Sequence, residues 1–206
     1  SWPVMIQQVF QTLMRTTDII ITGMFSPVAV AAIGLADLYA QVSIRLGQGL
    51  GGSAIALSSQ DTGSGATANR DEAVTQAILL GLVTGIPFVL FGLSFGYEAL
   101  AILGANDTVA SLGGTYLAIV FATAPARQVS LIAARSLQGT GDTRTPMYVN
   151  VVSNGLNIVG SVTLGLGLFG VPRYEIVGVG VATAFSNVFT AVVLCAVMVA
   201  GRTSAG

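Results

Sequence analysis

The chain has 206 residues, of which 53% are hydrophobic and 8% charged, and its formal net charge is −1. Soluble domains carry about 25% charged residues, so this composition, with a mean hydropathy of +0.80, indicates an integral membrane protein without a sizeable soluble domain. The near-neutral charge excludes a basic surface for nucleic acid. One cysteine without any histidine excludes an internal disulfide and argues against a transition-metal site.

Six apolar stretches predict an all-α membrane protein, a bundle of six transmembrane helices that forms a single unit over residues 1–206. A crossing needs about 20 apolar residues, whereas β-barrel strands would show about ten residues of alternating polarity. The expected spans are residues 3–25, 28–59, 73–99, 110–136, 146–169 and 177–200. The glycine pairs Gly47/Gly51, Gly81/Gly85 and Gly92/Gly96 predict close contacts between these helices.

Polar residues follow one face of the first span, where Gln8, Gln11, Arg15, Asp18 and Thr22 recur at steps of three and four. A carboxylate at the bilayer centre costs about 2.5–3.5 kcal/mol on insertion scales, so this face must meet other helices or a water-filled path. Asp18 is therefore a candidate ion or substrate site. Paired with Arg15 it would stay ionised; unpaired, it would exchange a proton near neutral pH or bind a cation such as Na⁺.

One face of the second span carries Asp37, Gln41, Arg45, Gln48 and Gly52, with Asp37 and Arg45 two turns apart. They predict a charge network, with Arg15 as one partner for Asp37, or a purely structural role if this long helix extends beyond the bilayer. The stretch 60–72 (QDTGSGATANRDE) that follows is acidic and rich in small polar residues, which predicts a loop. Because all eight basic residues are arginines, this composition is compatible with a salt-adapted, archaeal source.

Polar faces recur in the later spans, whereas the third span is expected to face lipid. These faces comprise Tyr116, Thr123, Arg127 and Ser130 in the fourth span, Asn150, Asn154, Asn157 and Ser161 in the fifth, and Thr183, Asn187 and Thr190 in the sixth. Five polar faces predict a hydrated translocation path. Alternatively, a single Asn, Ser or Thr on such a face only forms a structural hydrogen bond to a neighbouring helix, which contributes about 0.6 kcal/mol on average. Arg127 and Arg135 are expected to snorkel to the interface.

Connections between spans add two predictions. Thr145 followed by Pro146 predicts an N-cap and a first-turn proline for the fifth helix. Arginine placement predicts the orientation, because Arg70, Arg135, Arg144 and Arg202 lie at cytoplasmic ends if the N-terminal side is inside, and only Arg173 lies outside. We therefore expect a multi-pass protein of the plasma membrane with its N-terminal side cytoplasmic. The chain begins at Ser1 without a signal-peptide pattern, so we expect a fragment.

Three stretches carry a family resemblance. TTDIIITGMFSPVAVAAIGLADL (16–38) resembles the first hairpin of the multidrug and toxic compound extrusion (MATE) family, with an Asp before a Gly and a short outer turn. AARSLQGTGDTRTPMYVNVVSNGLNI (133–158) resembles that family's connection between its fourth and fifth helices. GVGVATAFSNV (178–188) resembles the start of its sixth helix.

The resemblance implies secondary active transport rather than enzymatic activity. Members of this family have twelve helices in two lobes and export cationic or amphiphilic compounds against an H⁺ or Na⁺ gradient, without a cofactor. This chain would be the N-terminal lobe, and its C-terminal partner lobe would be missing.

Several residues match the family's functional positions. Asp18 matches its first-helix Asp, which is thought to bind the coupling ion, and Asn157 matches its fifth-helix Asn; Thr183 and Tyr116 match polar residues of the sixth and fourth helices. Ser161 stands where some members carry a second Asp, so a site with two carboxylates is not expected. Gln8, Gln11, Asn150 and Asn154 would line the cavity.

Two alternatives stay open at this point. A lipid-linked oligosaccharide or polysaccharide flippase of the same broad fold would use a more basic cavity, for which Arg15, Arg45 and Arg127 are available. A non-transporting membrane scaffold would need no titrating carboxylate, so it would show no ion binding between about pH 5 and 8.

Overall fold

The structure is a computed structural model that describes residues 2–64 and 69–203, and within them every regular element is an α-helix. The expected all-α bundle is therefore confirmed. The helices are α1 (Trp2–Phe25), α2 (Pro27–Ser64), α3 (Asn69–Ile102), α4 (Asp107–Ala122), α5 (Ala124–Gly139), α6 (Arg144–Leu166) and α7 (Glu175–Thr203). Of Arg70 and Arg202 only the backbone is described.

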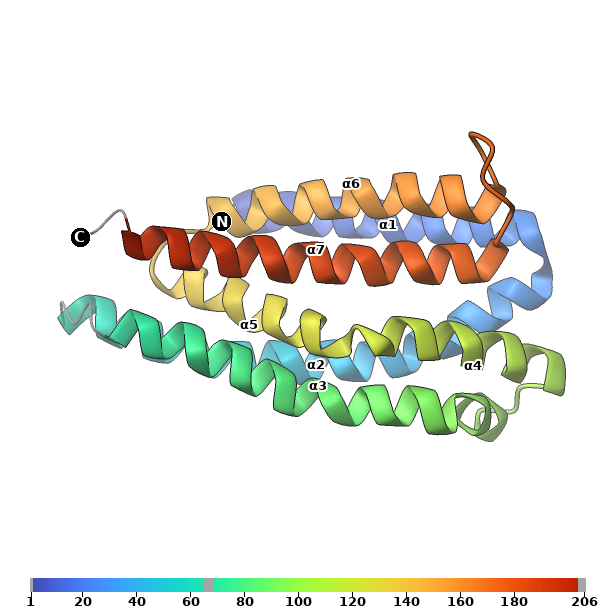
Figure 1. The fold of residues 1–206 in the computed structure, drawn as a ribbon, viewed down its shortest axis with the longest axis horizontal. Helices are drawn as coiled ribbons and strands as arrows, with labels where there is room; N and C mark the ends of the chain where they lie inside the picture. Colours follow the sequence, from blue (N-terminus) through green and yellow to red (C-terminus); the bar gives the residue numbers. More distant parts are fainter. Residues whose placement is uncertain (1, 65–68, 204–206) are drawn as a thin grey trace.

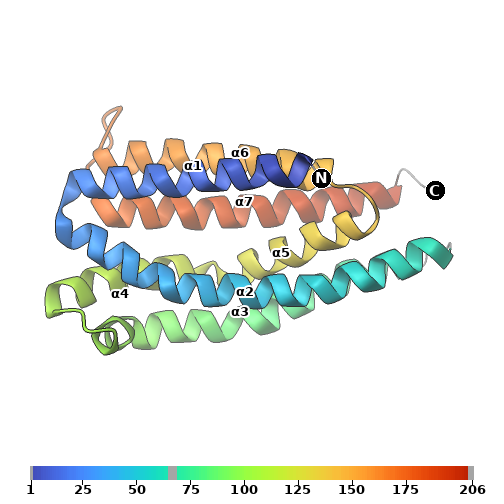
Figure 2. The ribbon, with the colours of Figure 1, turned by 180° about the vertical axis from the view of Figure 1, so that it is seen from behind.

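The helices form two layers, seen from opposite sides in Figures 1 and 2. One layer holds α1, α6 and α7, and the other holds α2, α3, α4 and α5; α7 packs against both α4 and α5 between them. The start of α1, the end of α2, the start of α3, the α5–α6 connection and the end of α7 lie at one end of the bundle, here called the terminal end. The α1–α2, α3–α4 and α6–α7 connections lie at the opposite end, here called the hairpin end (Figure 1).

The fourth expected span, 110–136, is broken rather than continuous. Its two parts, α4 and α5, meet at Thr123 with a bend of 51°. Pro125 explains the break, because proline has no amide hydrogen and its ring clashes with the carbonyl four residues earlier, here Phe121. The Thr123 hydroxyl donates a hydrogen bond to the Val120 carbonyl oxygen (3.0 Å) and so satisfies part of the interrupted backbone.

Two expected connections differ from the structure. The loop expected over 60–72 is largely helical, because α2 continues to Ser64 and α3 begins at Asn69; residues 65–68 lie outside the described residues. The helix that was expected to be capped by Thr145 begins at Arg144. The Asp142 carboxylate caps it by accepting hydrogen bonds from the backbone amides of Arg144 (3.2 Å) and Thr145 (3.0 Å).

Apolar length supports most of the expected crossings. Among the described residues four helices are long and apolar enough to span a membrane, or five if the bent α4–α5 pair counts as one span. The α1 helix is not among them, because its polar face lowers its hydropathy, so a crossing by α1 stays a prediction. The α2 helix has 38 residues, about 57 Å at 1.5 Å per residue, so it extends well beyond a 30 Å hydrocarbon core.

The main hydrophobic core is built largely from residues near the hairpin end. Leu100, Leu117 and Phe121 are buried there, and the Phe121 ring contacts Phe88 edge to face with ring centroids 5.3 Å apart. The expected glycine contacts are present: a side chain on Gly81 or Gly85 of α3 would meet the backbone of α5, and one on Gly47 or Gly51 of α2 would meet α5 side chains; one on Gly92 or Gly96 would meet α4.

Candidate functional site

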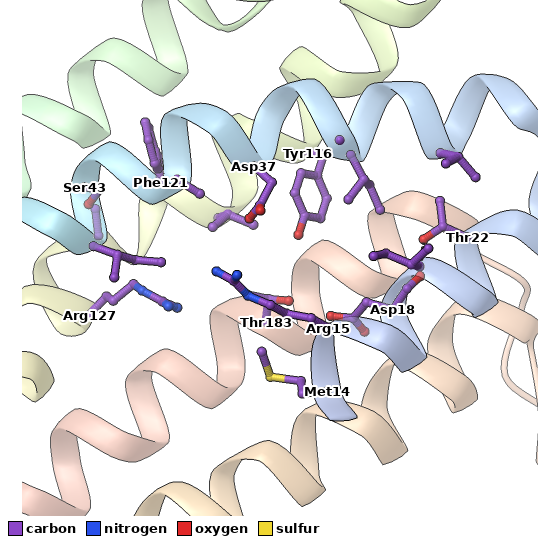
Figure 3. A pocket seen from close by; sticks show the side chains of 18 residues that line it. Met14, Arg15, Asp18, Thr22, Asp37, Ser43, Tyr116, Phe121, Arg127 and Thr183 are labelled. Atoms are coloured by element: carbon purple, nitrogen blue, oxygen red, sulfur yellow. Dashed lines mark hydrogen bonds between the residues drawn. The ribbon is translucent and has the colours of Figure 1, made fainter. Parts of the chain in front are cut away.

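A cavity of about 310 Å³ lies between the two layers, lined by residues of α1, α2, α4, α5 and α7 (Figure 3). Four charged side chains reach it: Arg15 and Asp18 from α1, Asp37 from α2 and Arg127 from α5. The rest of the lining is mainly apolar, with the aromatic rings of Tyr116 and Phe121 on the α4 side. The cavity therefore combines opposite charges with an apolar wall, as ligand sites commonly do.

Asp18 is half-buried, and one of its carboxylate oxygens has no partner. Its Oδ1 atom is buried without a hydrogen bond to any described residue, whereas the Ser161 hydroxyl of α6 interacts with the carboxylate. On the next turn of α1, the Thr22 hydroxyl donates to the Asp18 backbone carbonyl and not to the carboxylate. A buried oxygen that lacks a partner is expected to acquire a proton, a water molecule or a cation.

Neutral polar side chains from α6 and α7 surround Asp18. The Asn157 side-chain amide donates to the Thr183 hydroxyl oxygen (3.1 Å), and that hydroxyl donates to the Val179 carbonyl oxygen (3.0 Å). The Ser161 hydroxyl also lies 3.4 Å from Asn157 Oδ1, so its single proton has two acceptors within reach, the Asn157 oxygen and the Asp18 carboxylate. The Tyr116 hydroxyl adds a contact to Thr183.

The charged residues of the cavity do not form ion pairs with one another. Among the residues whose side chains the structure describes, one ion pair occurs, Arg173–Glu175 at the hairpin end (3.4 Å). Arg15 therefore neutralises neither Asp18 nor Asp37 by direct contact. The Gln41 amide contacts one of them at a time: its nitrogen donates to Asp37 Oδ2 (3.3 Å), or, in the flipped orientation, its oxygen accepts from Arg15 Nη1 (3.1 Å).

Arg127 was expected to snorkel to the interface, and this expectation is wrong. Because α5 starts anew after the break at Thr123, Arg127 lies in the first turn of that helix and lines the cavity. Its Nη1 donates to Asn187 Oδ1 of α7 (2.9 Å), and the Asn187 amide nitrogen donates to the Thr123 hydroxyl oxygen (3.2 Å). Asn187 thus links the cavity arginine to the helix break.

The other expected site residues lie elsewhere. Gln8 and Gln11 are exposed on α1 and do not line this cavity. Asn150 donates to the Pro146 carbonyl oxygen of its own helix (2.7 Å), and Asn154 is half-buried outside the cavity. Arg45 is exposed on α2, so it belongs to no charge network with Asp37. The helical spacing placed these residues on one face, but it did not show how far along the helix the cavity extends.

Sequence reasoning missed two contacts, although both residues belong to predicted polar faces. Asn187 links Arg127 to Thr123, and Gln41 reaches either Asp37 or Arg15. The signal for Asn187 was present in Pro125, which marks the place where α4 ends and α5 turns toward α7. No group of three or more His, Cys, Asp or Glu side chains occurs in the described part of the chain. Around Asp18 the structure places one carboxylate among the hydroxyl and amide oxygens of Ser161, Thr183 and Asn157.

The chain as a whole is similar in sequence and in fold to known transporters. Residues 3–163 match the MatE family. The chain is 30% identical over 203 residues to the probable multidrug resistance protein NorM of Rhodopseudomonas palustris, an alignment that covers 96% of this chain and 42% of that protein. Two solved structures align with 26% identity: MATE in the bent conformation (TM-score 0.83, covering 93% of this chain and 42% of that chain) and MATE in the straight conformation (TM-score 0.82, 97% and 44%). The chain thus spans about two fifths of the length of the relatives it matches.

Proposed function

Because the chain belongs to the MatE family, whose members are membrane transporters and not enzymes, we propose that it forms one lobe of a secondary antiporter. This antiporter exports small amphiphilic compounds, mainly cationic ones, in exchange for H⁺ or Na⁺. The coupling ion binds at Asp18, with Ser161, Asn157, Thr183 and Tyr116 around it. No cofactor takes part.

The proposal depends on one observation, the buried Asp18 Oδ1 that has no hydrogen-bond partner among the described residues. An ionised carboxylate in an apolar layer is unfavourable by about 2.5–3.5 kcal/mol on insertion scales. A proton on Oδ1 removes that charge, and a Na⁺ ion held with hydroxyl and amide oxygens neutralises it. Either ion therefore stabilises the arrangement in which Asp18 is buried.

The hydroxyl of Ser161 connects the state of Asp18 to the packing of α1 against α6. When Asp18 is ionised, the Ser161 hydroxyl donates its hydrogen bond to the carboxylate, because a hydrogen bond to a charged acceptor is stronger than one to a neutral acceptor. When Asp18 is protonated, the same hydroxyl is free to donate to Asn157 Oδ1, which lies 3.4 Å away. Loading the ion thus changes which helix–helix contacts are made, and this difference shifts the balance between transport states.

We further propose that the lobe works with a second helical lobe, as the remaining length of its relatives suggests. Alternating access in such proteins requires two halves that rock around a shared site. Arginine placement supports a cytoplasmic terminal end. Arg135 and Arg144 lie beside the α5–α6 connection at that end, while Arg173 lies in the α6–α7 connection at the hairpin end.

Efflux by the intact protein in proteoliposomes tests the coupling site. Asp18→Asn keeps the shape of the side chain but removes its exchangeable proton and its charge, so ion-driven efflux of a cationic dye should fall to the level of empty vesicles. Asp107→Asn is the matched control. Asp107 is exposed at the hairpin end, where it accepts a hydrogen bond from the Tyr97 hydroxyl (2.9 Å). Efflux by the Asp107→Asn variant should therefore equal efflux by the unsubstituted protein. Undiminished efflux by the Asp18 variant would refute the assignment.

A further inference from the structure

Two arginines face one another across the cavity without a carboxylate partner. Arg15 extends from α1 and Arg127 from α5, and Figure 3 shows their guanidinium groups pointing toward each other. They are close enough for their charges to interact. Like charges facing one another repel unless a negative group lies between them. The arrangement is therefore complementary to an anion.

Arg127 also has donor capacity that the described residues leave unused. Its Nη1 is bound to Asn187 Oδ1, but its Nε–H is buried and has no acceptor. Removing a guanidinium group from water costs several kcal/mol unless acceptors replace the lost hydration. The Nε and Nη atoms form a planar fork whose geometry matches the two oxygens of a carboxylate or phosphate group.

Neither carboxylate of the cavity forms an ion pair with this fork, although Asp37 is near enough for its charge to act on Arg127. Asp18 lies beyond Arg15 on the side away from Arg127 (Figure 3), and Asp37 lies on α2 within hydrogen-bonding distance of the Gln41 amide (3.3 Å). The lining therefore contains a pair of positive groups and a pair of carboxylates that do not neutralise one another directly. The same lining includes the apolar side chains of Phe121 and Ile33. Such a lining suits a molecule with both a cationic and an anionic group.

We propose that Arg127 and Arg15 form an oxyanion subsite, so that preferred substrates carry a carboxylate or phosphate group in addition to a cationic one. Arg127 binds the oxyanion through its fork, and Arg15 adds a second positive charge from the opposite wall. Asn187 is a positioning residue for Arg127. The inference rests on the proposed transport function, because it names the substrate class of the same cavity.

A matched pair of dyes tests the subsite on the intact protein in lipid nanodiscs. Rhodamine B carries a carboxylate and a delocalised cation, and its ethyl ester retains only the cation. By fluorescence anisotropy, the unsubstituted protein should bind the acid more tightly than the ester. Because a hydrogen bond to a charged group contributes about 1.5–3 kcal/mol, Arg127→Gln should weaken binding of the acid about tenfold or more and leave the ester unchanged. Arg127→Lys, which keeps the charge but not the fork, should weaken it less.

Two further variants keep the test decisive. Arg135→Gln removes the same charge from α5 outside the cavity, where Arg135 Nη1 donates to Gln138 Oε1 (3.3 Å), and should leave both dyes unchanged. Arg15→Gln changes an exposed side chain, so it addresses the subsite even if the Arg127 variants fail to fold. An acid-to-ester ratio that stays the same in folded Arg127 or Arg15 variants would overturn the subsite. The dye-binding result is independent of the transport proposal. A failure of that proposal would appear in the efflux assay instead, as undiminished efflux by the Asp18→Asn variant.

The same assay identifies the source of the oxyanion. Dihexanoylphosphatidylglycerol presents a lipid phosphate without a cation. Its competition with rhodamine B is measured in the unsubstituted protein and in Arg127→Gln. Displacement that is lost in Arg127→Gln supports the subsite and assigns it to a lipid headgroup. An Arg127-dependent preference for the acid without displacement by the lipid supports the subsite and assigns it to carboxylates of soluble substrates. Displacement that persists in Arg127→Gln contradicts the subsite.

Discussion

At the scale of single residues, most buried polar groups between α6 and α7 satisfy one another. Thr190 donates to Ser153 Oγ (2.6 Å), and Ser153 donates to the Ser186 carbonyl oxygen (3.1 Å), so this cluster behaves as structural contacts between helices. Four buried side-chain atoms lack a partner among the described residues, and two of them, Asp18 Oδ1 and Arg127 Nε, belong to residues that line the cavity; the others are Gln7 Nε2 and Gln128 Oε1. In native proteins such exceptions are few, and a bound ion or water molecule is one of their recognised explanations.

The first prediction at this scale concerns the fully buried Asn157, which is 1% exposed. Asn157→Ala removes the donor to Thr183 and the acceptor for Ser161, so the free energy of unfolding should fall by about 0.6–1.7 kcal/mol, the range of such bonds in membranes. Reversible unfolding in mixed detergent micelles measures this change. Asn154→Ala is the matched control on the same helix, since the Asn154 side chain makes no hydrogen bond within the described ranges. Equal losses in the two variants would contradict this account.

At the scale of helices, the break between α4 and α5 shapes the cavity. It bends the chain by 51°, and it brings Arg127 into the first turn of a new helix, beside α7. The α3 helix supports the bend from the other side, because Gly85 packs directly on the backbone at Ala124 and Pro125. Small residues allow backbones in membranes to approach this closely.

The glycine contact leads to a prediction with an internal control. A Cβ atom on Gly85 would lie 3.0 Å from the Ala124 carbonyl carbon and 2.5 Å from the Pro125 nitrogen, which are backbone atoms that cannot rotate away. Gly85→Ala should therefore destabilise the protein by about 1–3 kcal/mol. Gly155→Ala should be neutral or stabilising, because no atom lies within 4 Å of the place that its methyl group would occupy and alanine favours helices by about 1 kcal/mol. Melting temperatures in detergent distinguish them, and similar temperatures for both would disprove the packing role.

The same elements show how far the sequence alone was informative. Apolar length and spacing predicted five of the helices and the face that carries Asp18 and Arg15, because burial in lipid imposes these patterns strongly. The break at Thr123 was missed even though Pro125 signals it, since the surrounding run is continuously apolar. The route from Arg127 through Asn187 to Thr123 was not predictable, because it joins residues 60 and 64 positions apart and depends on how α7 packs against the bend.

At the scale of the whole molecule, the two ends of the bundle differ in charge and in packing. Near the hairpin end, the core around Leu100 and Leu117 fills the space between the layers. Arg173 lies at this end, over the Phe25 ring with its guanidinium carbon 5.5 Å from the ring centroid, and next to Glu175, its partner in an ion pair. Arg135 and Arg144 flank the connection at the terminal end without an acidic ion-pair partner among the described residues. An excess of arginines in the short connections marks the cytoplasmic side of a membrane protein.

This asymmetry predicts the orientation, and cysteine labelling in intact cells measures it. Cys195 is the single native cysteine, so Cys195→Ser provides a background without thiols. In that background Thr108→Cys places an exposed thiol at the start of α4 near the hairpin end, and Glu72→Cys places one near the start of α3 at the terminal end. A membrane-impermeant maleimide should label position 108 in intact cells, and position 72 only after the membrane is permeabilised. The reverse pattern would place the terminal end outside, and the arginines of that end would then contradict the charge rule on which the orientation depends.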